Sequence, residues 1–236
     1  MLETPWYVPT SDFLARMERS ERNQLLRLGQ SRHYARHSSI FQAGSPGKNV
    51  YLLISGRVKI YALSAVGKQT ILWFCFPGEL FGLAEVPRCG EREVNAEAST
   101  DCEVLAVSQH DFKNFLARHP STAMMVIELL SCRLRTLGEI LKNLSVDDVE
   151  TRMIKLLVHL CARFGRPGEG DAEITLDIGL THQEMADMIG ATRQSVTSIF
   201  SDLRRKGVLR IENRSIRVHR GEVLEKLASR GSVALY

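Results

Sequence analysis

Short apolar runs separated by glycines extend from about residue 32 to residue 108. The runs VYLLIS and VKIYAL flank Gly56, and QTILWFCF follows a turn at Gly67. This pattern predicts an all-β roll whose neighbouring runs pair as successive hairpins. A small helical segment over 11–30, capped by Ser11, is expected before the roll, and the amphipathic segment DFKNFLARHP closes it.

The apolar pattern changes its period after Pro120. Apolar side chains then recur at spacings of 3, 4, 3, 4 and 3 residues. They are Ile127, Leu130, Leu134, Leu137, Leu141 and Leu144. A mean spacing of 3.5 residues indicates a coiled-coil seam, so we predict a helix over 120–144 that joins two copies of the chain. The alternative is that this face packs against its own domain.

Residues 181–203, THQEMADMIGATRQSVTSIFSDL, predict two short helices joined by a tight turn. Thr181 and Glu184 have the spacing of a capping box, and Gly190 suits the left-handed conformation of the turn. Thr192 is the expected cap of the second helix. Apolar side chains on both helices would form a shared core, namely Met185, Ile189, Val196 and Ile199. This is the pattern of a helix-turn-helix, although a helical hairpin that never touches DNA is the alternative.

The flanking segments extend this interpretation to a winged helix-turn-helix. An amphipathic helix is expected over 147–164 and a strand at ITLDI, while VLRIE and SIRVH flank Asn213-Arg214 as a two-stranded wing. The predicted fold class is α+β. Its parts are a jelly-roll-like β-roll domain over 1–119, a dimerisation helix over 120–144 and a DNA-binding domain over 145–236.

Positive charge is concentrated near the predicted helix-turn-helix of residues 181–203, which we call the reader. The 236-residue chain carries a net charge of +4, whereas residues 192–220 alone hold eight Lys or Arg against two acidic residues, a net charge of +6. Such a concentration favours neutralisation of DNA phosphates over an ordinary solvated surface.

Several classes of protein are disfavoured. No run of 18 apolar residues occurs, and the N-terminus resembles no signal peptide, so we expect a cytoplasmic protein without a membrane span. The five cysteines form no CxxC pair, so we expect reduced thiols, no metal site and no iron–sulfur cluster. The motifs HExxH and GxSxG are also missing, so an enzyme is disfavoured and no catalytic residue is assigned.

The order of these parts resembles the bacterial regulators typified by the cyclic-AMP receptor protein and the fumarate–nitrate reduction regulator. The specific parts of the resemblance are PGELFG at 77–82, the heptad helix, and THQEMADMIGATRQSV at 181–196. It implies a homodimer that binds a pseudo-palindromic promoter site on double-stranded DNA and responds to a signal sensed by the roll. By analogy alone, the loop 165–172 is a candidate contact with RNA polymerase.

The resemblance also maps an effector pocket onto the chain. The mapped positions are Gly82, Leu83, Arg92, Glu93, Leu137 and Gly138. In the cyclic-AMP receptor a glutamate, an arginine–serine pair and a threonine–serine pair hold the nucleotide. Leu83, Leu137 and Gly138 offer no such hydrogen bonds, and Glu93 would repel a phosphate near Arg92. We therefore expect a signal other than cyclic AMP, of unknown identity.

Two alternatives remain at this point. Haem or redox sensing is conceivable through single side chains, namely Cys75, His33, His37, His110 and His119. A ligand-binding regulatory subunit without DNA activity would use the roll and the long helix but would not need a basic reader.

The resemblance and the helical pattern together assign roles in DNA binding. Arg193 suits guanine, Gln194 suits adenine, and Ser198 completes the outward face that reads bases. Phosphate contacts are expected from both helices and the wing, at His182, Gln183, Thr192, Arg214 and Arg217. A hinge near residues 143–147 would let an effector shift the population of reader arrangements.

Overall fold

The computed structural model describes residues 13–87, 90–168, 173–212 and 215–219. These residues fall in two compact units whose boundary along the chain lies between Ser131 and Cys132, and each unit is described by itself. The long helix α4 (Pro120–Val146) contributes its first part to one unit and its second part to the other. The mixed α+β fold class predicted from the sequence is confirmed.

Two helices precede the roll, where a single helical segment was predicted. They are α1 (Phe13–Arg16) and α2 (Arg19–Leu28). The chain is extended at Glu18, with φ −58° and ψ 143°, and this interrupts the helical path. The expected cap at Ser11 lies outside the described residues.

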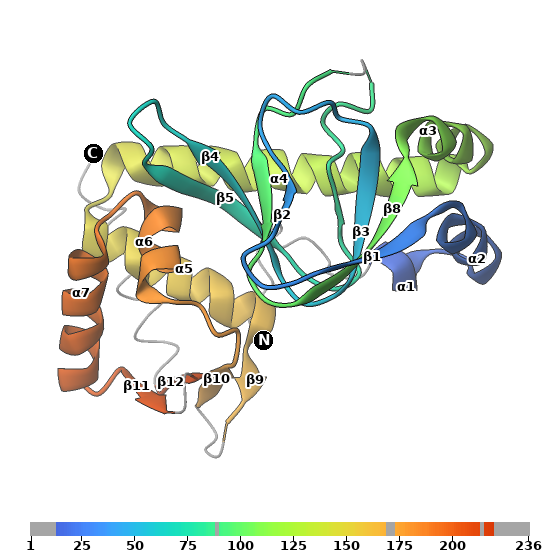
Figure 1. Cartoon of the computed structure of the whole chain (residues 1–236). Coiled ribbons are helices and arrows are strands. Elements are labelled where there is room, and N and C mark those ends of the chain that lie inside the picture. The colour runs from blue at the N-terminus through green and yellow to red at the C-terminus, as the bar shows by residue number, and fades with distance from the viewer. Residues whose placement is uncertain (1–12, 88–89, 169–172, 213–214, 220–236) are drawn as a thin grey trace. The chain divides into compact units, whose positions relative to one another are not determined.

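The roll consists of two four-stranded antiparallel sheets (Figure 1). The first sheet has the order β1 (Gln30–Tyr34), β8 (Cys102–Ser108), β3 (Asn49–Ser55) and β6 (Leu80–Phe81). The second has the order β2 (Ser39–Phe41), β7 (Asn95–Ala98), β4 (Val58–Leu63) and β5 (Gln69–Cys75). Buried residues from both sheets, among them Tyr51, Leu53, Ile60, Val104 and Phe81, form one apolar cluster.

The predicted hairpin between the runs flanking Gly56 is wrong. β3 pairs with β8 and β6, whereas β4 pairs with β5 and β7 in the other sheet. Gly56 has a φ of +88°, and a Cβ there would lie 2.2 Å from the carbonyl oxygen of Asp101. The glycine therefore forms a tight corner that carries the chain from one sheet to the other. The second predicted hairpin, between β4 and β5 around Gly67, is confirmed.

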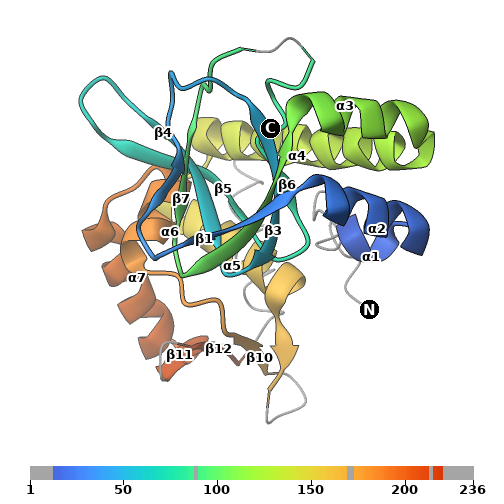
Figure 2. The ribbon, with the colours of Figure 1, turned by 45° about the vertical axis from the view of Figure 1, so that its right-hand side comes forward.

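Helices cover one end of the roll. Figure 2 shows α3 (Gln109–Arg118) beside α2. Ser108 caps α3 by accepting a hydrogen bond from the Asp111 amide. Glu21 of α2 accepts hydrogen bonds from Thr122 and Ser121 in the first turn of α4, and the Thr122 bond is the main cause of its lowered pKa.

The C-terminal unit is a winged helix-turn-helix, as predicted. It contains α5 (Val149–Phe164), α6 (His182–Ile189), α7 (Arg193–Arg205) and a sheet of order β11-β12-β10-β9. The strands are β9 (Arg166–Pro167), β10 (Ile174–Leu176), β11 (Leu209–Glu212) and β12 (Ser215–Val218). The β11–β12 pair confirms the wing, although Asn213 and Arg214 at its turn lie outside the described residues. No helix among the residues described is long and apolar enough to span a membrane.

Candidate nucleic-acid interface

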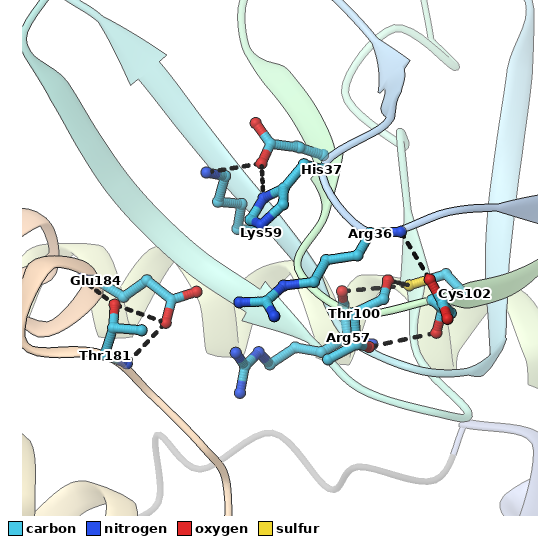
Figure 3. Close-up of polar contacts among 10 residues, drawn as sticks. Arg36, His37, Arg57, Lys59, Thr100, Cys102, Thr181 and Glu184 are labelled. Carbon is cyan, nitrogen blue, oxygen red and sulfur yellow. Dashed lines mark hydrogen bonds and ion pairs between the residues drawn. The ribbon is translucent and has the colours of Figure 1, made fainter.

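The two helices of the reader begin and end as the sequence predicts. Thr181 accepts a hydrogen bond from the Glu184 amide, and the Glu184 carboxylate accepts one from the Thr181 amide at 2.8 Å (Figure 3). Gly190 ends α6 in the left-handed conformation, with a φ of 65°. The Thr192 side chain accepts a hydrogen bond from the Ser195 amide and so caps α7. These caps fix where each helix starts and hence which side chains fall on each face.

α7 presents a buried face and an exposed face. Val196, Phe200 and Leu203 are buried in a core shared with α5, α6 and the sheet. The predicted core positions Met185 and Ile189 are buried in that core, and Ile199 packs against it. The residues predicted to read bases are exposed, namely Arg193, Gln194 and Ser198. Packing of the apolar face therefore leaves this polar face free.

The predicted phosphate-contacting residues on and near α6 differ in their exposure and in their contacts with other side chains. Thr192 and Gln183 are exposed, and the Gln183 amide nitrogen donates a hydrogen bond to Asp187 at 2.8 Å. His182 is only partly exposed because its ring stacks on Phe200, with ring centroids 4.8 Å apart. Its pKa is lowered, first by burial and then by the charge of Arg193.

Arg217, another candidate for a phosphate contact, lies in a network of ion pairs on the wing. Its Nε atom is 3.3 Å from a Glu212 carboxylate oxygen, and its Nη1 atom is 3.9 Å from Glu173. Glu173 also pairs with Arg210 at 3.4 Å and lies 3.8 Å from the His219 ring. Sequence reasoning missed Glu173, because its partners are set by the pairing of β10 with β12 and not by any local motif.

The predicted seam on α4 is largely exposed in the single chain. Five of its six apolar side chains are 41% to 72% exposed, namely Ile127, Leu130, Leu134, Leu141 and Leu144. Leu137 is partly buried. Met124 and Val146, which the heptad count leaves out, are also exposed. Contact of a long apolar stripe with water is unfavourable, so burial of this face against another surface would be favoured.

Arg92, the candidate anion ligand of the roll, is already occupied by a carboxylate of the same chain. It is only 2% exposed, and its guanidinium forms an ion pair with the buried side chain of Glu85. It also donates to the carbonyl oxygen of Asn49 and lies over the Phe41 ring, 4.2 Å from the centroid. Sequence reasoning missed Glu85, which stands seven residues before its partner in a loop without a recognisable pattern.

The remaining predicted pocket residues differ in their surroundings. Glu93 is exposed, and Leu83 is buried in a separate apolar cluster. Gly82 has a φ of +70°, which favours glycine, and a Cβ there would lie 2.9 Å from Arg92 Nη1. Leu137 and Gly138 belong to the other compact unit, where no described residue beyond the helix's own nearby backbone lies within 4 Å of the site of a Cβ on Gly138.

The candidates for haem ligation are scattered over the roll. Cys75 is buried in the apolar cluster, whereas His33, on β1, is exposed. The other three histidines have polar neighbours of their own, which are Glu97 for His37, Asn114 for His110, and Glu21 and Gln24 for His119. Among the described residues no group of three or more His, Cys, Asp or Glu side chains is placed to hold a metal ion.

Comparison with known proteins assigns both units. Residues 31–119 match a family model described as cyclic nucleotide-binding domain, and residues 151–227 match one described as Crp-like helix-turn-helix domain. The chain is 31% identical over 199 residues to the cyclic AMP receptor protein of Thermus thermophilus, covering 84% of this chain and 88% of that protein. The chain belongs to the CRP/FNR family of DNA-binding transcription regulators.

Further comparisons show how the family varies. The global nitrogen regulator of Nostoc sp. is 30% identical over 196 residues, covering 82% of this regulator and 86% of that protein. The solved structure of a mutant of CooA from Carboxydothermus hydrogenoformans superposes with a TM-score of 0.76 at 24% identity, covering 87% of this regulator and 90% of that chain. This last likeness concerns the fold alone.

The buried pair of Arg92 and Glu85 generates a stability prediction. Replacement of Glu85 by alanine leaves a buried guanidinium unpaired and should lower the free energy of unfolding by about 3 to 5 kcal/mol in urea titrations. The further change Arg92→Leu removes that charge and should recover most of the loss. Glu93→Ala, at an exposed carboxylate one residue from Arg92, is the control and should stay within about 0.5 kcal/mol of the wild type. Equal losses for Glu85→Ala and Glu93→Ala would contradict the pairing.

Proposed function

We propose that this regulator is a homodimer that reads a pseudo-palindromic operator and acts in the cytoplasm, where its DNA target lies. The observation that carries this proposal is the combination of an exposed heptad stripe on α4 with a polar, capped first turn on α7. Two copies joined along α4 would supply two readers, and a two-fold dimer suits half-sites about one helical turn of DNA apart.

The α4 stripe supports dimerisation on energetic grounds. Full burial of a fully exposed leucine contributes about 1.5 to 3 kcal/mol through the hydrophobic effect, and each side chain of the stripe, 41% to 72% exposed, would contribute part of this. The stripe holds several such side chains in each chain, and a parallel pair would cover both sets at once. This sum is of the same order as the cost of association if most of the stripe is covered.

The exposed face of α7 supports the assignment of base contacts. Arg193 can donate two hydrogen bonds to guanine, and Gln194 can pair with adenine. Both stand in the first turn of a helix whose N-terminus also favours nearby phosphate. Ser198 follows one turn later on the same face and adds a shorter polar contact.

The phosphate contacts are expected first from the residues around the reader's helix ends. These residues are Gln183, Thr192 and His182. On the wing, Arg214 remains a candidate, whereas Arg217 would have to leave Glu212 before it neutralised a phosphate. We therefore expect Arg217 to contribute less to the salt dependence of binding than its charge suggests.

The pair of Arg92 and Glu85 supports a signal other than cyclic AMP. A cyclic phosphate would have to displace a buried carboxylate from Arg92, and it would find Leu83 in place of a hydrogen-bonding partner for a ribose. Relatives of similar identity are named as a cyclic AMP receptor and as a global nitrogen regulator, so family membership is compatible with different signals. The signal would act by shifting the population of reader arrangements about residues 143–147.

Arg193→Ala tests base reading. On the duplex that the wild-type protein selects from random-sequence DNA, this change should cost about 1 to 3 kcal/mol and relax the preference at one base pair. Arg204→Ala is the matched control, because it removes the same charge from an exposed site about 16 Å further along the helix. Equal weakening on every duplex after Arg193→Ala would reduce Arg193 to a phosphate contact.

Leu134→Asp tests the seam. A carboxylate on the stripe cannot be buried against a second helix without a large desolvation cost, so the protein should sediment as a single chain and lose tight operator binding. Val66→Asp, at another exposed apolar site, which lies in the roll, should remain dimeric. The seam assignment fails if Leu134→Asp sediments and binds like the wild type.

A further inference from the structure

His182 joins the two helices of the reader. It is the first residue of α6, and its ring stacks on Phe200 of α7 with an interplanar angle of 23°. Its Nδ1 atom lies 3.0 Å from the hydroxyl oxygen of Thr197, also on α7. The ring is therefore held in one orientation by a stacking contact and a hydrogen bond.

The bond to Thr197 fixes which ring nitrogen carries the proton. The Thr197 hydroxyl donates to the carbonyl oxygen of Arg193 at 2.9 Å. A hydroxyl has a single proton, so Thr197 must accept from His182 and the Nδ1 atom must be the donor. In the neutral ring the proton then sits on Nδ1, and Nε2 is left as an acceptor.

The Nε2 atom of His182 determines which hydrogen bond the ring can make to DNA. Nε2 makes no hydrogen bond to any described residue, and phosphate oxygens only accept hydrogen bonds. A neutral His182 would therefore set a lone pair against a phosphate. Only the imidazolium can donate from Nε2 to a phosphate while Nδ1 keeps its bond to Thr197.

The surroundings of the ring favour its neutral form in the absence of DNA. Burial lowers the pKa of His182, and so does Arg193, the charged group that acts on it from the neighbouring helix. On its own helix, the Glu184 carboxylate is bonded to Thr181 in the capping box. A phosphate brought next to Nε2 would act in the opposite direction, because a negative charge favours the imidazolium.

We propose that operator binding by this regulator takes up a proton at His182, which then donates Nε2–H to a backbone phosphate. This rests on the proposed placement of the start of α6 against the DNA. DNA binding raises the affinity of the ring for a proton, so binding is tighter below the pKa of the bound form. The gain is lost as pH rises through that value, with a limit of about tenfold in affinity per pH unit for one proton.

Fluorescence anisotropy with the duplex selected by the wild-type protein, at constant ionic strength, tests the proposal. Between about pH 8 and about pH 6, the wild-type affinity should rise by about threefold to tenfold. His182→Gln cannot titrate and should show a flat profile. His219→Gln removes a histidine from the wing and should keep the wild-type profile, while His159 stays neutral in this range because burial and Arg163 lower its pKa to about 4.

Thr197→Val separates the proposal from a general effect of the histidine. This change removes the acceptor that holds the proton on Nδ1 and preserves the shape of the side chain. The neutral ring can then carry its proton on Nε2 and donate to the phosphate without taking one up. The pH profile should flatten although His182 is present, and NMR of the ring nitrogens should show the proton moving from Nδ1 to Nε2.

A wild-type profile that is flat, a His182→Gln profile as steep as that of the wild type, or an Nε2–H tautomer in the free wild-type protein would each overturn the proposal. Failure to select any duplex at any pH is a different result, because it would overturn the proposed function itself. Circular dichroism at each pH confirms that the variants remain folded.

Discussion

The burial of one face of α7 is the constraint on which the reader depends. Val196, Phe200 and Leu203 are withdrawn from water into the core of the C-terminal unit, so rotation of the helix about its axis would expose large apolar side chains. The opposite face, with Arg193 and Gln194, is presented as a consequence of that packing. The caps of α6 and α7 fix where each helix begins, and so determine which polar residues fall in the first turn.

In the roll, by contrast, the buried charge of Arg92 is neutralised by a residue of the same chain. Glu85 supplies the counter-charge that a ligand would otherwise bring to Arg92, and the aromatic ring of Phe41 covers the guanidinium. Removal of one partner from a buried pair of this kind is costly, because it leaves the other charge buried and unpaired. Arg92 is already paired within the roll, so a signal molecule that bound at this arginine would have to compete with Glu85.

The sequence predicts features set by local chemistry and regular period. The capping box at Thr181, the left-handed turn at Gly190 and the heptad stripe each follow from spacing alone, and the structure bears out the caps and the turn. The features it missed depend on contacts between distant residues. Gly56 looks like a hairpin turn but is a corner between sheets, and the partner of Arg92 depends on the path of a loop. Glu173 is likewise paired through strand register.

Hydroxyl-radical footprinting of the selected duplex tests the central claim most directly. Two rigid readers joined along α4 should protect two half-sites centred about 34 Å apart on one side of the duplex. Their sequences should be related by a two-fold axis. A single protected segment without an internal repeat, formed by a protein that sediments as one chain, would contradict the account.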